Sequence, residues 1–592
     1  MSNIRKILRF LKPYRLQVLI AIAAMSFLSI TDLLVPRQVQ VIIDQGIAQQ
    51  DIDIVLRSSL MMIGLVFLSM GLAFVNTLLS MKVSQSFSAD LREKVFSKIQ
   101  HFSFANFDHL QTGELLVRLT SDVNTVQMAV QMTMRIAFRA PLMLIGSLIL
   151  LVSTSQRLAL ILAVLLPMVL ILTLIFSKRA RKLFQEVQKR LEKVNIVLHE
   201  NIAGVRLVRS FVRSDYERGR FSQRNEDLTQ KGIEVGRLMS FLLPTMILVL
   251  NLGIVILLWF GGNMVLDGVL TTGQIVAFSN YLFMTMFPLI LLAMILPQYF
   301  SAMASMERIS EVIETQPTIV YPENTSEHIT AGQVTFEAVS MDYDGHENEH
   351  IPVLQEVSFT AFPGEEVAIL GATGSGKTSL VNLIPRFYDP TQGRVLIDGV
   401  DVREISQDEL RRNIAVALQN AILFSGTVAE NIRFGRPEAT DEEVIAAAKA
   451  AQAHAFIMEK EDGYQAKVEQ RGANFSGGQK QRLAIARALC VNPRILILDD
   501  STSAVDVETE AEIQAALQEL MNGRTSFVVA QRISTVLRAD RIIVLEKGRL
   551  AAQGTHQELI ASSPIYQAIY HSQLGDGAEK IETLPFVEVQ NA

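Results

Sequence analysis

The sequence predicts a chain of two parts, an all-α membrane domain of six spanning helices followed by a soluble α/β domain. Three observations support this fold class. Apolar residues are concentrated in the first half of the 592-residue chain. After about residue 301 the composition becomes that of a soluble α/β domain. Within this second half, a glycine-rich loop stands between an apolar run and a helix-forming run, which is typical of a domain that binds phosphate groups.

The overall composition favours a membrane protein. Hydrophobic residues make up 49% and charged residues 19% of the chain, whereas soluble proteins carry about 25% charged residues. This composition excludes a disordered chain. The net charge of -6 gives no indication of nucleic-acid binding. The single cysteine, Cys490, excludes an internal disulfide and a cysteine-rich metal site.

Six apolar runs are long enough to span a bilayer, which takes about 20 largely apolar residues. They cover residues 16–36, 58–81, 136–153, 158–176, 238–260 and 274–298. Only a few residues around Gln156 and Arg157 separate the third run from the fourth, so we expect a helical hairpin there. No small-residue cleavage site follows the first run, which we interpret as a retained helix.

Loop charges orient these spans, because basic loops stay in the cytoplasm. Before the first span there are five basic residues and no acid: Arg5, Lys6, Arg9, Lys12 and Arg15. The first loop holds three acids against one base, so it faces outward: Arg37, Asp44, Asp51 and Asp53. Four bases open the fourth loop, which faces inward: Lys178, Arg179, Arg181 and Lys182. Six spans therefore predict a multi-pass protein of the inner or plasma membrane. Both termini and the soluble domain then lie in the cytoplasm.

The domain boundaries follow from the same pattern. We expect the membrane domain at 1–320, the soluble domain at 330–574 and a loose tail at 575–592. The two long inner loops, about 82–135 and 177–237, contain few helix breakers. We interpret them as helical extensions of the spans into the cytoplasm.

The second half carries a phosphate-binding loop. A predicted strand at 366–370 is followed by Gly371, Ala372, Thr373, Gly374, Ser375, Gly376, Lys377, Thr378 and Ser379. Glycines let backbone N–H groups close around phosphates, and the following helix adds its dipole. Lys377 is placed to reach the β and γ oxygens, and the Thr378 hydroxyl is placed to bind Mg²⁺.

Two further motifs complete a nucleotide site. An apolar run at 495–498 ends in Asp499, which a parallel sheet would bring beside the phosphate loop to hold Mg²⁺. Between these motifs a helix start carries Phe475, Ser476, Gly477, Gly478 and Gln479. Small residues there expose N–H groups to an anion. Since the subunit already has a phosphate loop, we expect this second site to bind a nucleotide held by a partner subunit.

Taken together, these three motifs resemble an ATP-binding cassette. Six spans ahead of one cassette resemble a half-transporter of the ABC exporter type, and the resemblance covers nearly the whole chain. It implies ATP and Mg²⁺ as cofactors, an ATP-hydrolysing translocase, a lipid bilayer as environment and a second half-transporter as partner.

More positions match the family. Tyr343 matches the aromatic residue that stacks on adenine, Gln419 the glutamine near Mg²⁺ between the cassette lobes, and Asp506 the loop that crosses to the partner. Two segments resemble the inner loops that dock on the cassettes through short coupling helices: Phe107-Asp108 with 112–115, and 204–206 with Phe211.

Two catalytic positions depart from the family pattern. The family has Glu after the magnesium-site Asp, as the base that polarises the attacking water, whereas this chain has Asp500. An aspartate is one methylene shorter, so its carboxylate falls short of that water by roughly an ångström. The family also has a His that contacts the γ-phosphate, whereas this chain has Gln531, which cannot carry the imidazole proton.

Two dimers are compatible with these departures. In a homodimer, both ATP sites would lack the usual base and switch. In a heterodimer, this chain would contribute one impaired site, and its intact signature from Phe475 to Gln479 would complete the competent site of the partner. The second interpretation resembles the impaired-site subunit of bacterial heterodimeric multidrug exporters.

The membrane half carries candidate pathway residues. Asp32 lies within an apolar run, where it either faces a cavity or a partner, as a cation site or outer gate, or is hydrated near the outer interface. Asn280 is either interhelical glue or a ligand. Phe283, Met284 and Phe287 give the sixth span a soft apolar surface that suits varied ligands or ordinary packing.

The sequence thus predicts an exporter subunit for hydrophobic or amphipathic small molecules of the multidrug type. A lipid or peptide translocator with the same machinery is the alternative within the class. A nucleotide-sensing regulator that transports nothing is the alternative from another class.

Overall fold

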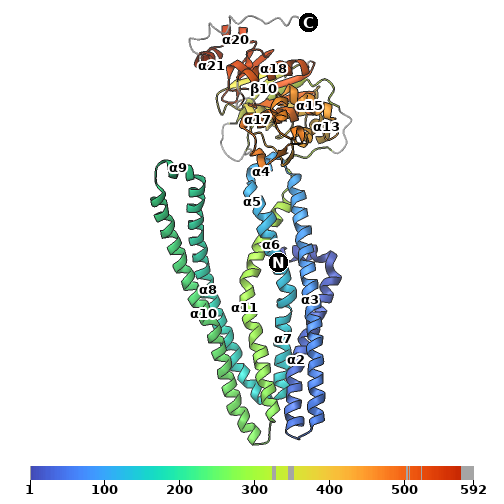
Figure 1. Cartoon of the computed structure of the whole chain (residues 1–592), viewed down its shortest axis with the longest axis vertical. Helices are drawn as coiled ribbons and strands as arrows, with labels where there is room; N and C mark the ends of the chain where they lie inside the picture. Colours follow the sequence, from blue (N-terminus) through green and yellow to red (C-terminus); the bar gives the residue numbers. More distant parts are fainter. Residues whose placement is uncertain are drawn as a thin grey trace. The chain divides into compact units, whose positions relative to one another are not determined.

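The computed structural model describes residues 2–322, 328–343, 352–501, 505, 507–521 and 523–574 (Figure 1). The chain divides into two compact units, Met1–Gln100 with Thr112–Thr315, and His101–Gln111 with Gln316–Ala592. The sequence placed all of 1–320 in the membrane domain. The short segment His101–Gln111 differs from that expectation, because its contacts group it with the second unit.

The described part of the first unit consists of helices joined by short turns. Its α-helices are α1 (Ser2–Leu11), α2 (Arg15–Val41), α3 (Ile52–Gln100), α5 (Thr112–Val117), α6 (Val123–Met132), α7 (Arg139–Thr154), α8 (Gln156–Ala203), α9 (Val205–Ser210), α10 (Ser214–Leu266) and α11 (Thr272–Glu314). π-Helical turns at Arg118–Asp122 and Thr133–Ala137 join α5, α6 and α7 into one run. α3 has 49 residues, which at 1.5 Å per residue is about 73 Å long.

Five helical segments of the described residues are long and apolar enough to cross a membrane by length and composition. They are Ile4–Ile47, Ile52–Gln100, Thr112–Thr154, Gln156–Ala203 and Ser214–Leu266. The predicted run 274–298 lies in α11, which is not among these five. The structure therefore supports a multi-pass helical domain, and the count of six spans stays a prediction.

Short connections pair the long helices. Ser155 alone separates α7 from α8, and its hydroxyl accepts a hydrogen bond from the Leu158 N–H at 3.4 Å, which caps α8. Thr271 caps α11 with Gln274 in a reciprocal capping box. α8 and α10 lie side by side along their length, and α9 connects them (Figure 1).

The second unit is an α/β domain with two larger sheets. The first sheet has the order β2-β1-β4-β5, and its three strand pairs are antiparallel. The second has the order β12-β11-β3-β10-β9-β6, in which only β12 runs antiparallel to its neighbour. The strands are β1 (Val334–Met341), β2 (Leu354–Ala361), β3 (Glu366–Gly371), β4 (Gln392–Ile397), β5 (Val400–Asp401), β6 (Ile414–Ala417), β7 (Gly426–Thr427), β8 (Lys467–Val468), β9 (Ile495–Asp499), β10 (Thr525–Val529), β11 (Arg541–Glu546) and β12 (Arg549–Gly554).

Short and medium helices make up the rest of the regular structure of this unit. They are α4 (Phe104–His109), α12 (Lys377–Leu383), α13 (Gln407–Asn413), α14 (Val428–Ile432), α15 (Asp441–Ala450), α16 (His454–Met458), α17 (Gly477–Cys490), α18 (Val507–Leu520), α19 (Ile533–Val536), α20 (His556–Ser562) and α21 (Pro564–Leu574). Separate apolar clusters hold two regions: one contains α12 and the first sheet, and another contains Phe475 with α15 and most of α17.

The parallel register positions the functional site. β3, β10 and β9 are neighbours, with Val529 paired to both Ile369 and Asp499. Because parallel strands end at one edge of a sheet, the segments after β3, β9 and β10 meet there. These segments are the phosphate loop, Asp500 and Gln531.

Candidate functional site

The phosphate loop connects β3 to α12. Gly374 and Gly376 have φ angles of +81° and +98°, which glycine adopts at little cost. A Cβ at Gly376 would lie 2.9 Å from the carbonyl oxygen of Val353, so the loop also needs glycine for space. Lys377 is nearly buried, and its ammonium donates to the carbonyls of Gly371 and Ala372 at 2.8 and 3.0 Å. The loop is therefore folded as a phosphate cradle.

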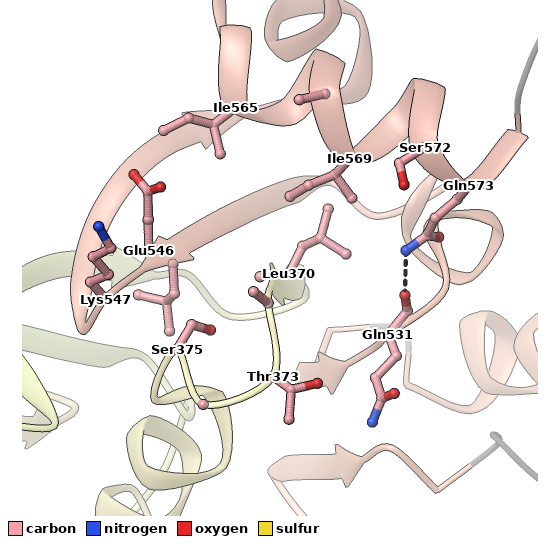
Figure 2. Close-up of a pocket in the computed structure, with 15 residues that line it drawn as sticks. Leu370, Thr373, Ser375, Gln531, Glu546, Lys547, Ile565, Ile569, Ser572 and Gln573 are labelled. Atoms are coloured by element: carbon pink, nitrogen blue, oxygen red, sulfur yellow. Dashed lines mark hydrogen bonds between the residues drawn. The ribbon is translucent and has the colours of Figure 1, made fainter.

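The charges and polar atoms of this cradle suit an anion. Burial lowers the pKa of the Lys377 ammonium, and the carboxylates of Asp500 and Asp499 act in the opposite direction. The Ser375 hydroxyl is buried and has no hydrogen-bond partner among the described residues. A buried donor without a partner costs about 1–3 kcal/mol, and a phosphate oxygen would satisfy it. Figure 2 shows Thr373 and Ser375 on the loop, with Gln531 nearby.

Two hard oxygen ligands lie together beside the loop. The Thr378 hydroxyl donates to Asp499 Oδ1 at 3.0 Å, and Asp499 is only 3% exposed. Burial raises the pKa of Asp499, whereas the hydrogen bond from Thr378 lowers it. Hydroxyl and carboxylate oxygens are ligands that Mg²⁺ prefers. These two residues would hold the Mg²⁺ that accompanies a nucleotide, and the ion supplies charge neutralisation at the phosphates. Among the described residues, no group of three or more His, Cys, Asp or Glu is arranged to hold a metal.

Asp500 is enclosed by two amides. Its Oδ2 accepts hydrogen bonds from Gln419 Nε2 at 3.0 Å and from Gln531 Nε2 at 2.8 Å. The carboxylate is buried, whereas both glutamines are exposed. Burial raises the pKa of Asp500, and the Gln419 hydrogen bond and the Lys377 charge act in the opposite direction. Gln419, which the sequence predicts near the metal, thus contacts Asp500, and Gln531 contacts the same oxygen.

Tyr343 contacts the end of the phosphate-loop segment. Its hydroxyl is 2.8 Å from the Ser379 hydroxyl, and its ring packs edge-on against Tyr388 with centroids 5.0 Å apart. The Tyr388 hydroxyl donates to Asp108 on α4 at 2.9 Å. Phe104 on α4 stacks on Phe387 at 4.3 Å. The predicted coupling segment and the predicted adenine-stacking residue are therefore linked through one tyrosine.

The signature residues form the start of α17. Ser476 caps the helix: its hydroxyl accepts from the Gln479 N–H at 3.3 Å, and Gln479 Oε1 accepts from the Ser476 N–H at 3.0 Å. Ser476 and Gly477 are exposed. Phe475 is buried in the apolar cluster that also contains α15 and most of α17. The first two residues of the motif's polar part, Ser476 and Gly477, are thus presented on the surface of the single chain. Asp506 lies outside the described residues, as do Ser503 and Ala504 before it.

Asp32 in α2 has a partner that was not predicted from the sequence. Its Oδ2 is 2.7 Å from Arg139 Nη2 on α7, and the Ser69 hydroxyl donates to Oδ1 at 3.4 Å. α2 continues past Asp32 to Val41, with a π-helical segment to Ile47. Asp32 therefore lies within a long helical run and is paired, which lowers the cost of placing an acid there.

The candidate residues of α11 divide between two faces. Asn280 is exposed, and Phe283 and Phe287 are 49% and 45% exposed in the single chain. Their spacing of three and four places them in one stripe, and the two rings stack with centroids 5.8 Å apart. The Asn280 amide donates to the Val276 carbonyl of its own helix at 2.9 Å. Met284 instead packs against the apolar cluster of the helical unit.

Three residues with contacts at these sites were not predicted from the sequence: Arg139, Tyr388 and Gln573. An arginine inside an apolar run was a detectable signal for Arg139, because such a charge needs a partner. The other two carry no local signal, since each depends on a contact between distant segments: Tyr388 is 280 positions from Asp108, and Gln573 is 42 positions from Gln531.

Comparison with known proteins places this geometry in a family. Residues 18–289 match the family model of the ABC transporter transmembrane region, and residues 354–503 match the family model described as ABC transporter. The ABC transporter ATP-binding protein YfiB of Bacillus subtilis is 40% identical over 581 residues, which is 97% of this chain and 100% of that protein. The chain belongs to the ABC transporter family.

Two more relatives define its type. The ATP-dependent lipid A-core flippase of Desulfotalea psychrophila is 34% identical, over 96% of this chain and 99% of that protein. A solved structure of a bacterial Atm1-family ABC exporter with ATP bound matches with a TM-score of 0.77 at 25% identity, over 98% of this chain and 99% of that chain. This ABC transporter is thus an exporter-type half-transporter, with a helical membrane domain fused to one cassette.

The family assignment settles the coarse activity. The cassette is that of an ATP-hydrolysing transporter and binds ATP with Mg²⁺. The chain is a multi-pass membrane protein, and its cassette is expected in the cytoplasm.

Proposed function

We propose that this chain is the impaired-site subunit of a heterodimeric ABC exporter. One observation carries the proposal: Asp500, at the position of the catalytic base, is held by the amides of Gln419 and Gln531 on one carboxylate oxygen. A general base needs a lone pair directed at the attacking water. The shorter side chain and its amide contacts both oppose that arrangement, so this site binds ATP and cleaves it slowly.

The binding machinery beside Asp500 supports retention of ATP. Lys377 is folded onto the phosphate loop and Thr378 bonds to Asp499, which supports assigning phosphate binding to the first and magnesium binding to the other two. The exposed start of α17 is likewise intact, with Ser476 capping the helix. A chain that keeps its own binding site and its signature, but lacks a base and the family histidine, is suited to complete a competent site on its partner.

The transport cycle follows from this division of roles. Two ATP molecules bring the cassettes together, since each is held by one phosphate loop and the opposite signature. The contacts of Phe104 and Asp108 with Phe387 and Tyr388 carry that closure to the coupling segment. Hydrolysis at the site completed by Ser476 and Gly477 then resets the membrane domain, in which we propose six spans with both termini in the cytoplasm.

For the substrate we propose hydrophobic or amphipathic small molecules of the multidrug type. The exposed stripe of Asn280, Phe283 and Phe287 offers two stacked rings and one amide, which suits ligands that are largely apolar with a polar group. A lipid is the second candidate, since a relative 34% identical to this chain is a lipid A-core flippase. Transport of a fluorescent cationic dye and of a labelled lipid in vesicles containing the chain and its partner distinguishes the two.

The first prediction concerns the chain purified without a partner. We expect it to bind ATP but to turn it over about 100-fold more slowly than a site with general-base help, for which losses of about 10²–10⁴ are typical. Mg²⁺-dependent phosphate release and ATP binding are measured on the same preparation, with Lys377→Ala as the control that loses binding. Rapid Mg²⁺-dependent turnover by the lone chain would show that its own site is competent and would favour a homodimer.

A further inference from the structure

The loop that carries Gln531 is held by a residue far along the chain. Gln573 lies near the end of α21, and its side chain makes two hydrogen bonds to this loop. Nε2 donates to the Gln531 carbonyl oxygen at 2.7 Å, and Oε1 accepts from the Ile533 N–H at 2.7 Å. Figure 2 shows the first of these bonds, which bridges α21 and the loop. One amide group therefore holds the backbone on both sides of Arg532.

These bonds supply what the loop itself lacks. The sheet holds the chain as far as Ala530, whose N–H donates to the Ile369 carbonyl at 3.2 Å. α19 then begins at Ile533 and has only four residues, and its N-cap residue, Arg532, makes no side-chain capping bond. A helix start leaves N–H groups that need partners. Gln573 provides such a partner from a different helix.

The helix that carries Gln573 is firmly anchored. Tyr566 and Tyr570 of α21 are buried in one apolar cluster with Ile533 and Val536 of α19. The Tyr566 hydroxyl also lies 2.7 Å from Nδ1 of His556. Buried aromatic side chains give a helix much of its packing energy, so α21 is a rigid support for the Gln573 amide.

Open space lies beside the loop. A pocket of about 590 Å³ is lined by the phosphate loop residues 371–375, Gln531, the β11–β12 turn and the exposed side of α21 including Gln573. Because this space is unfilled by side chains, packing does not fix Gln531 on that side. The hydrogen bonds from Gln573 then decide where the Gln531 backbone lies.

We propose that Gln573 is a positioning residue of the ATP site, which acts through Gln531. By holding the Gln531 carbonyl and the Ile533 N–H, it directs the Gln531 amide toward Asp500, 2.8 Å away. The end of α21 is thereby linked to the residue that replaces the family histidine. This role holds whether the site is slow or competent, because it concerns geometry and not the chemistry of the base.

The test uses Gln573→Met in the full-length chain, since methionine keeps the length and volume of glutamine but makes neither hydrogen bond. We expect the slow single-turnover cleavage of ATP by the lone chain to fall about tenfold further. The reason is that the Gln531 amide stands where the family has its γ-phosphate contact, and small misplacements at a reacting centre cost about that much or more. The dissociation constant for ATP should change less than about twofold, since the phosphate loop is untouched. Gln567→Met is the matched control: Gln567 is on the same helix and donates to the Ile560 carbonyl, away from the loop.

A double-mutant cycle separates positioning from general destabilisation. In a Gln531→Ala background, Gln573→Met should lower the rate less than about twofold further, because the residue through which it acts is gone. An equal tenfold loss in both backgrounds would overturn the proposal, as would an equal loss in the Gln567→Met control. An unchanged rate for Gln573→Met in the wild-type background would overturn it as well.

Hydrogen exchange gives a readout that does not depend on ATPase activity. The Ile533 amide loses its acceptor in Gln573→Met, so exchange in a peptide covering 530–536 should accelerate roughly fivefold, as for loss of one hydrogen bond, whereas Gln567→Met should leave it unchanged. Unchanged exchange in Gln573→Met would overturn the contact itself. Rapid ATP turnover by the wild-type chain would contradict only the slow-site proposal, since every comparison here is a ratio to wild type.

Discussion

Gly477→Asp in the assembled transporter is expected to lower ATPase activity by about 1000-fold, whereas Asp500→Ala should lower it less than about twofold. Gly477 is the first residue of α17 and is exposed, where the signature would meet the γ-phosphate of a nucleotide held by the partner. Two like charges 4 Å apart repel by about 4 kcal/mol at an effective dielectric constant of 20. That energy corresponds to the expected loss, because the cassettes could no longer close on this ATP.

The asymmetry between the two variants follows from the division of roles. Asp500 belongs to this chain's own slow site, where its carboxylate is already held by two amides, so little turnover remains to be lost. An aspartate in the first turn of a helix is favourable to the helix dipole, so Gly477→Asp should fold normally.

Steady-state ATPase activity of the co-purified pair decides between the roles, with ATP binding measured separately. Gly477→Asn is the matched control, since it has nearly the same shape without the charge and should retain much more activity. A larger loss in Asp500→Ala than in Gly477→Asp would mean that this chain's own site drives transport, and the proposed assignment would be wrong.

The second large expected effect is an increase in ATP turnover. Asp500→Glu combined with Gln531→His should raise ATP turnover of the lone chain about 100-fold, because a positioned general base contributes roughly 10²–10⁴. The added methylene extends the carboxylate toward the attacking water, and the imidazole replaces an amide that holds Asp500 Oδ2. Asp500 has a φ angle of +48°, which a glutamate adopts less readily than an aspartate, so a modest loss of thermal stability should accompany the gain.

Single variants and a phosphate-loop control make this result interpretable. Each single change should recover only part of the rate, since the base and the γ-phosphate contact act together. Lys377→Ala in the double-variant background should abolish the gain. If the double variant folds, binds ATP and still turns over at the wild-type rate, then the two departures are not what limits this site.

The nucleotide motifs were predictable because their chemistry is local. The glycines of the phosphate loop, Lys377 and Thr378 are consecutive, and Asp499 ends a run of four apolar residues. Parallel pairing of β9 with β10 and of β10 with β3 then brings Asp499 to Thr378. The residue types and their order were sufficient, because a parallel sheet allows few arrangements of these strands.

The contacts that give the site its character were not predictable. Gln419 and Asp500 are 81 positions apart, and Gln531 and Asp500 are 31 apart. Which polar atom a buried carboxylate selects depends on tertiary placement to within a few tenths of an ångström. The same limit applies to Asp32, whose partner Arg139 lies 107 positions away, although the cost of a lone charge in an apolar run required some partner.

The helical character of the first unit was predictable from the sequence, but the lengths of its helices and its boundaries were not. Hydropathy marks only the part of a helix that matches the bilayer core, about 30 Å. The run from Ile52 to Gln100 is a single helix more than twice that length. The sequence also assigned His101–Gln111 to the membrane domain, but Phe104 and Asp108 pack on Phe387 and Tyr388, and only the tertiary contacts reveal that grouping.

The central claim is that this chain's site retains ATP while the site of its partner hydrolyses it. The most direct measurement traps the co-purified pair during a single turnover with a photoreactive, labelled ATP and identifies the nucleotide attached to each subunit. Labelling at this chain's phosphate loop, which Lys377→Ala should abolish, reports its own site. We expect ATP at this loop and ADP at the loop of the partner. Equal amounts of ADP at both loops would contradict it.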